Sequence, residues 1–192
     1  MITSIHRIGK LATLLIVTQL AFGMCAIAQT DSNNYKTEVV FKDVKVPWAM
    51  AWLPNGDMLV TERAGKLLRV NDGKLVAEIK GLPEIYAKGQ GGLLDVILDP
   101  NYAKNSWIYI SYSSPEGSGD GANTAIMRAK IENNTLVDKK VLYKAGPNTT
   151  RGQHYGSRIA FDNDGFLYFS VGDRGDRDVN PQDITRDGGK DL

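Results

Sequence analysis

The feature that most constrains the fold is a series of short apolar segments separated by turn residues, with almost no helical periodicity. The first four segments are 49–52, 58–61, 67–70 and 75–79, and the residues between them include Asn55-Gly56, Ala64-Gly65 and Asp72-Gly73. Short apolar runs joined by such turns are typical of antiparallel strands connected as hairpins. This part of the chain therefore predicts a four-stranded antiparallel meander.

The same unit recurs along the chain. The strands expected in a second unit are 94–98, 107–112, 124–131 and 136–143. A third unit begins at 157–161, turns at 162–165 and continues at 166–171. Repeated four-stranded units indicate β-propeller blades. The predicted fold class is all-β, with about three blades of a larger ring, and a β-sandwich with chance turn similarity is the alternative.

The N-terminus has the features of a secretory signal peptide. Arg7 and Lys10 precede an apolar run at 11–24, and small residues at Ala26 and Ala28 follow it. This order is typical of cleavage after Ala28. We therefore expect residues 1–28 to be a signal peptide and residues 29–192 to be a partial β-propeller.

The predicted signal peptide implies a periplasmic or secreted location. The apolar run is too short to span a bilayer comfortably, so no membrane span is expected in the mature chain. A retained N-terminal anchor and lipid attachment at Cys25 are less favoured alternatives. Cleavage would remove Cys25 and His6, leaving His154 as the single histidine and no cysteine. A thiol nucleophile, a disulfide and a multi-histidine metal site are then excluded.

Charge excludes one class of partner. The formal net charge of the chain is +1, which argues against nucleic-acid binding through a broad basic surface. No nucleic-acid partner is expected.

His154 is the first candidate for chemistry. It lies between Gly152 and Gly156, just before a predicted strand. Imidazole can accept a proton at neutral pH, although a lone loop histidine is more often a surface or packing residue. Asp173 follows the next strand and could orient the ring by accepting a hydrogen bond, or it could belong to a solvated salt-bridge turn. Asp173 and Asp176 resemble a calcium loop only weakly, because no closing Glu follows.

Gln90 and Trp48 stand at places equivalent to His154 in the second and first units. Equivalent positions of propeller blades converge on one axis, so these side chains are predicted to share a site near the channel mouth. A Gln amide there could donate and accept hydrogen bonds with a ligand. Trp48 could line the pocket, but a place in the core is the safer prediction.

Five motifs in order also carry a family resemblance. They are PWAMAWLPNG at 47–56, VTER at 60–63, GQGGLLDV at 89–96, HYGSR at 154–158 and VGDRG at 171–175. Together they resemble the N-terminal half of the soluble glucose/sorbosone dehydrogenases that depend on pyrroloquinoline quinone (PQQ), in the periplasmic aldose sugar dehydrogenase branch.

The resemblance implies a six-bladed propeller, PQQ and calcium as cofactors, and oxidation of aldose sugars at C1. His154 would be the base and Asp173 an acid beside it, while Gln90 would contact the quinone; hydride would pass to the quinone, and electrons to an external acceptor. The parent protein could be a homodimer. Gln153 replaces an Asp found before the histidine in some glucose-oxidising members, which leaves the sugar open.

Three blades do not close a ring, so the chain is expected to be an N-terminal fragment of a longer protein. The resemblance implies that this fragment is inactive by itself, because the family's quinone-binding basic residues and calcium-binding groups come later. Arg174 and Arg177 are not expected to replace them. The alternatives are a complete small β protein, a propeller lactonase or similar hydrolase, and a non-catalytic extracytoplasmic sugar-binding propeller.

Overall fold

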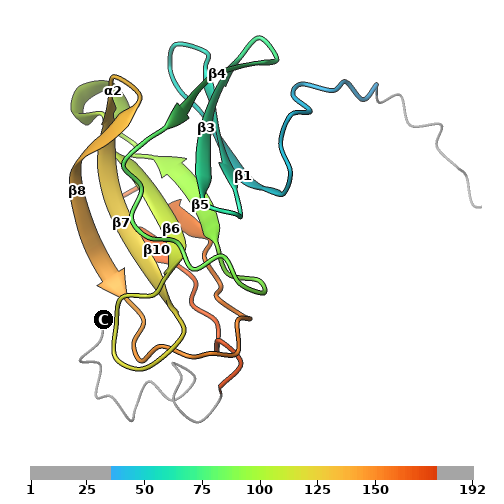
Figure 1. Ribbon diagram of the computed structural model, residues 1–192. Coiled ribbons are helices and arrows are strands. Elements are labelled where there is room, and N and C mark those ends of the chain that lie inside the picture. Colours follow the sequence, from blue (N-terminus) through green and yellow to red (C-terminus); the bar gives the residue numbers. More distant parts are fainter. Residues whose placement is uncertain (1–35, 177–192) are drawn as a thin grey trace, which may run out of the picture. The chain divides into compact units, whose positions relative to one another are not determined.

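The computed structural model describes residues 36–176. All described strands lie within residues 47–169 (Figure 1). The predicted signal peptide and residues 177–192 lie outside the described residues. Between residues 36 and 176, no helix is long and apolar enough to cross a membrane.

The first sheet is the predicted four-stranded meander. Its strands pair antiparallel in chain order: β1 (Pro47–Trp52), β2 (Met58–Glu62), β3 (Lys66–Asn71) and β4 (Lys74–Ile79). The β1–β2 turn is fixed by Asp57, whose carboxylate accepts hydrogen bonds from Asn71 and Arg69. These two contacts lower the pKa of Asp57.

The second sheet has the same order and a longer third and fourth strand. Its elements are β5 (Leu93–Leu98), β6 (Ile108–Ser114), β7 (Asn123–Glu132) and β8 (Thr135–Lys144), with the short helix α2 (Tyr102–Asn105) between β5 and β6. Figure 1 shows the four strands side by side in sequence order. The sequence pattern predicted no helix where α2 forms.

The third unit contains two strands within the described residues. β9 (Ile159–Phe161) and β10 (Leu167–Phe169) pair antiparallel through Ala160 and Tyr168. β9 begins two residues later than predicted and ends where predicted, whereas β10 is shorter than predicted at both ends. Sequential four-stranded antiparallel sheets followed by the start of a third confirm the all-β, propeller-blade fold class.

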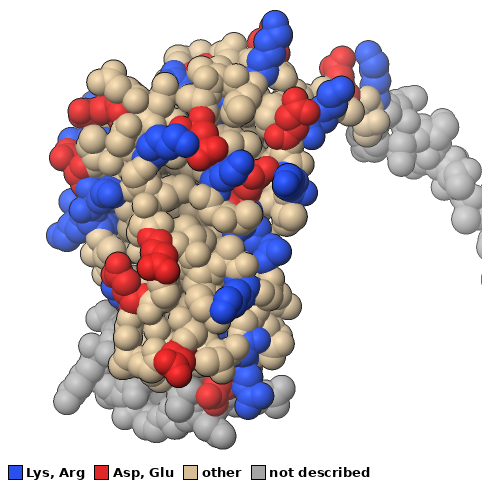
Figure 2. Space-filling view, in the orientation of Figure 1, with Lys and Arg blue, Asp and Glu red and all other residues tan. Residues whose placement is uncertain are grey.

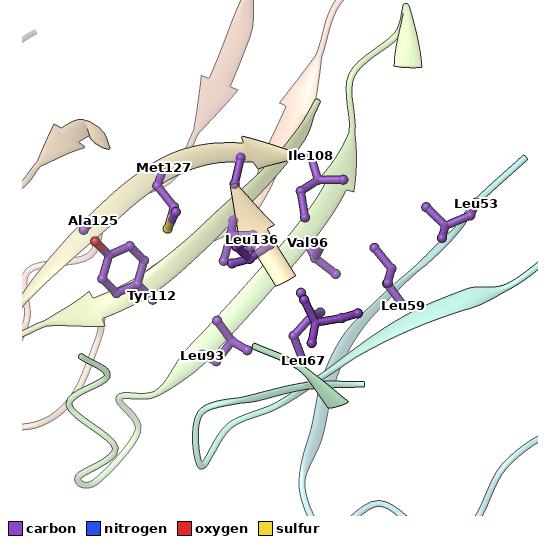
Figure 3. Packing of buried hydrophobic residues seen from close by; sticks show 13 residues of the cluster. Leu53, Leu59, Leu67, Leu93, Val96, Ile108, Tyr112, Ala125, Met127 and Leu136 are labelled. Carbon is purple, nitrogen blue, oxygen red and sulfur yellow. The ribbon is translucent and has the colours of Figure 1, made fainter. Parts of the chain in front are cut away.

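The first two sheets bury a common core. Leu59 and Leu67 of the first sheet point toward Leu93 and Val96 of β5 (Figure 3), and all four side chains are completely or almost completely buried. β1 and β2 contact β5, and β5 and β6 contact β9. The first strand of each unit therefore lies next to the first strand of the following one, which brings the residues preceding these strands to one end.

The outer face of β1 corrects one prediction. Trp48, Met50 and Trp52 alternate along the strand and are 41%, 60% and 55% exposed, while Ala49 and Ala51 face the core. The prediction that Trp48 fills the core is wrong, because the strand's two-residue alternation places its small side chains inward.

On the face seen in Figure 2, basic and acidic side chains are interspersed.

A buried carboxylate joins the second and third units. Asp95 on β5 is 1% exposed and accepts hydrogen bonds from the Ile159 amide (2.8 Å) and from the Arg158 guanidinium (3.1 Å). Because Ile159 opens β9, this carboxylate fixes where the third unit begins.

We expect Asp95→Ala to lower the free energy of unfolding by about 1–3 kcal/mol, since the buried Ile159 amide would lose its acceptor. Urea denaturation measures this. Glu116→Ala is the matched control, because it removes a carboxylate that pairs with Lys144 and is 62% exposed, and such pairs contribute about 0–1 kcal/mol. Equal effects of the two substitutions would contradict the role given to Asp95.

Candidate functional site

The site forms where two segments that precede inner strands meet. These lead-in segments are residues 88–92, before β5, and residues 151–158, before β9. The Gln90 amide donates to Gly152 O at 2.7 Å, and the Gln90 side-chain Oε1 accepts from the His154 amide at 2.9 Å. The structure thus brings Gln90 and His154 together, as their equivalent positions in the repeats predicted.

The contact with His154 orients the side-chain amide of Gln90. A backbone N–H can only donate, so the atom facing it must be the carbonyl oxygen of the side chain. The Gln90 Nε2 group is then left as the donor at this position. Gln90 is exposed, so that donor is accessible to a ligand at the end of the sheets.

His154 is held in an unusual backbone conformation. Its φ is +56°, and its carbonyl accepts a hydrogen bond from the Arg174 amide at 3.1 Å. Gly172 lies so close that a Cβ atom there would come 2.0 Å from His154 O. The VGDRG turn therefore needs glycine at this position in order to pack against the histidine backbone.

Asp173 binds the imidazole ring. Its Oδ1 lies 2.7 Å from His154 Nδ1 and also accepts the Gly175 amide at 2.8 Å. A carboxylate accepts hydrogen bonds, so the neutral ring carries its proton on Nδ1 and presents the lone pair of Nε2. The His154 side chain is 53% exposed and that of Asp173 only 11% exposed. The arrangement can accept a proton at Nε2 and stabilise the resulting imidazolium.

Arg174 lies buried beneath the surface of the site and contacts the VGDRG turn. Its side chain is fully buried, and its guanidinium donates to Gly172 O at 3.3 Å. Burial lowers the pKa of Arg174, while Tyr143, Tyr155 and the carboxylates of Asp173 and Asp176 oppose that shift. A guanidinium in this position contacts the turn itself, and the expectation that Arg174 does not replace a quinone-binding residue stays a prediction. Arg177 lies outside the described residues.

Tyr155 anchors the histidine segment to the second sheet. Tyr155 is 3% exposed and lies in a cluster with Leu94 and Ala122, and its carbonyl accepts a hydrogen bond from the Thr124 hydroxyl at 2.6 Å. Burial raises the pKa of the Tyr155 phenol. The residue after His154 is thus fixed in the core, while His154 itself remains exposed.

Trp48 is not part of this hydrogen-bonded group within residues 36–176. It lies on the exposed face of β1, whereas the first sheet reaches the site through Arg63, whose guanidinium donates to Gly89 O and Gly91 O. Sequence reasoning assigned no role to Arg63. The available clue was a basic residue directly after a strand, at the same end as the lead-in segments.

Calcium has no evident ligands in the described part of the chain. No group of three or more His, Cys, Asp or Glu side chains that could hold a metal ion occurs there. The carboxylates that do cluster near the site, Asp173 and Asp176, belong to the turn beside the imidazole. Calcium therefore stays an expectation of the resemblance, which places the calcium-binding groups later in the family sequence.

Comparisons with known proteins give a family for this chain. A family model described as Glucose / Sorbosone dehydrogenase matches residues 44–192. The chain belongs to the glucose/sorbosone dehydrogenase family. The match includes both lead-in segments and the VGDRG turn, so the contacts among Gln90, His154 and Asp173 all lie within the family region.

Curated relatives and solved structures give the same family. The chain is 36% identical to the aldose sugar dehydrogenase YliI of Escherichia coli over 157 residues, which is 80% of this chain and 42% of the relative. It is 31% identical to quinoprotein glucose dehydrogenase B of Acinetobacter calcoaceticus over 183 residues, which is 88% of this chain and 38% of the relative.

The structure also resembles the PQQ-bound form of an aldose sugar dehydrogenase from Streptomyces coelicolor. The TM-score is 0.65 at 28% identity, with 78% of this chain and 44% of that chain covered. Across these comparisons, the chain spans about two fifths of the length of its relatives.

Proposed function

We propose that these residues form part of the active site of a PQQ-dependent dehydrogenase that oxidises aldose sugars at C1. The observation that carries the proposal is the junction in which His154 contacts Asp173 through its ring and Gln90 through its backbone. Family membership supports the reaction class, and relatives named as aldose sugar and glucose dehydrogenases support the substrate class.

In this proposal His154 is the general base. Its Nε2 accepts the proton of the C1 hydroxyl as the hydrogen on C1 leaves as hydride. The ring becomes an imidazolium, which Asp173 stabilises at Nδ1 without itself taking the proton. PQQ, when bound, would supply the two-electron acceptor for that hydride.

Gln90 would contact the cofactor. Its Oε1 is occupied by the His154 amide, so its Nε2 donor would meet a quinone oxygen. This contact would place the cofactor beside the same histidine that receives the proton. The residues of this junction therefore fit the quinone, whereas no step is assigned to calcium.

We further propose a periplasmic or secreted location, from the predicted signal peptide, and an external electron acceptor. A homodimer of the parent protein is also part of the proposal. The described residues give no structural support for either partner. The 192-residue chain alone is proposed to turn over poorly, since it spans about two fifths of the length of its relatives.

The direct test is dye reduction with PQQ, calcium and a panel of aldoses, measured on this chain and on a longer protein that contains it. The expected result is aldose-dependent dye reduction by the longer protein. Bound PQQ with no oxidation of any aldose would contradict the proposal. Lactone hydrolysis in place of dye reduction would favour the hydrolase, and sugar binding without either reaction would favour the binding propeller.

A further inference from the structure

Arg63 directly follows β2 and holds the segment that carries Gln90. Its Nη1 donates to Gly89 O at 2.5 Å and to Gly91 O at 3.0 Å, the carbonyls on either side of Gln90. Its own carbonyl accepts the Leu93 amide at 3.0 Å. One residue of the first sheet therefore contacts the lead-in segment both beside Gln90 and where β5 begins.

The backbone of Arg63 is itself well anchored. Its amide donates to Val46 O at 3.0 Å, and the preceding strand β2 is buried along its whole length. Thr61, two residues earlier, donates from its hydroxyl to Leu94 O at 2.6 Å. Arg63 thus extends from a rigid strand, which suits a residue that fixes the position of a neighbouring segment.

The fit between Arg63 and the lead-in segment is close. A Cβ atom on Gly92 would lie 2.0 Å from Arg63 O and 2.6 Å from Arg63 Cγ. The aliphatic stem of the arginine therefore packs directly against Gly92, while its head group reaches the carbonyls of Gly89 and Gly91. Packing and hydrogen bonding by Arg63 therefore both act on the lead-in segment 88–92.

The contacts continue from this segment to His154. Gln90 makes two hydrogen bonds with the second lead-in segment: its backbone amide donates to Gly152 O, and its side-chain Oε1 accepts from the His154 backbone amide. We propose that Arg63 is a positioning residue: it sets the place of Gln90 and, through Gln90, the backbone of His154. Its catalytic importance rests on the proposed function, but the structural coupling does not.

Arg63→Met is the informative substitution, because it keeps an unbranched apolar stem and removes the donors. Amide hydrogen exchange followed by NMR reports on the His154 N–H, and the rate is compared with that of Ile110 in the core strand β6. We expect the His154 rate to rise about tenfold relative to Ile110, as one hydrogen bond weakens. Because His154 and His6 are the only histidines, the ring signals of His154 can be followed in the same samples.

Two variants control for general destabilisation. Arg63→Lys restores a cationic donor and is expected to recover most of the protection of the His154 amide. Arg69→Met removes an arginine of the same sheet that binds Asp57 at the β1–β2 turn, and it should leave the ratio of the His154 and Ile110 rates unchanged. An unchanged ratio in Arg63→Met, or an equal change in Arg69→Met, would overturn the proposal.

A double-mutant cycle tests whether Arg63 acts through Gln90. With Gln90→Ala already in place, Arg63→Met should cause little further change in the His154 exchange rate. Independent, additive effects would show that Arg63 does not act through Gln90. These readouts need neither sugar nor PQQ, so absence of turnover would count against the proposed function and leave this inference standing. Where turnover is measured, kcat should fall about tenfold or more in Arg63→Met and recover in Arg63→Lys.

Discussion

His154→Gln is expected to lower kcat/KM for aldoses by about 10²–10⁴-fold, the usual contribution of a general base. The substitution removes the Nε2 lone pair that Asp173 orients, while the backbone contacts with Gln90 and Arg174 remain possible. Since the side chain is 53% exposed, little stability should be lost. Steady-state dye reduction measures the activity, and thermal unfolding measures the stability.

Asp173→Asn is the companion variant. An Asn side chain turned with its amide toward the ring would donate to Nδ1, which selects the tautomer with its proton on Nε2 and removes the base. In serine proteases, replacing the aspartate beside the catalytic histidine by asparagine lowers kcat by about 10⁴-fold through the same change of tautomer. We therefore expect a loss of kcat/KM similar to that of His154→Gln. The ¹⁵N chemical shifts of the His154 ring report which tautomer is present. Full activity in His154→Gln would exclude His154 as the base, and full activity in Asp173→Asn would contradict the need for a carboxylate at position 173.

Gly172→Ala is expected to lower activity by about 10²-fold without touching any reacting group. Its Cβ would stand 2.0 Å from His154 O, and contacts under 3.0 Å are essentially never seen, so the two backbones must separate by about 1 Å. A displacement of a catalytic group by about 1 Å lowers the rate by about 10²-fold. Overpacking should also lower the free energy of unfolding by about 1–3 kcal/mol.

Gly146→Ala is the matched control for this substitution. No atom lies within 4 Å of the Cβ position at Gly146, and its φ is outside the left-handed region. The control should retain both activity and stability. If Gly172→Ala behaved in the same way, the close approach of the VGDRG turn to the histidine would not matter for function.

The local features of this fold could be predicted from the sequence. Two-residue alternation and Asn-Gly or Asp-Gly turns act between neighbouring residues, so all eight strands of the first two sheets lie close to where the pattern placed them. The pairing of Gln90 with His154 also followed from the sequence, since both precede the first strand of a repeat. α2 was missed because its four residues are too few to show helical periodicity.

The order of strands and turns, and the residues that precede each inner strand, could be read from the sequence, because these depend on short-range propensity and on repetition. Three features became visible only in the folded chain: Arg63 binds the Gln90 segment 26 residues later, Gln90 binds an amide 64 residues later, and Trp48 faces outward. Such contacts depend on how one sheet packs against the next, and no local pattern encodes the distance between two backbones that approach across that interface.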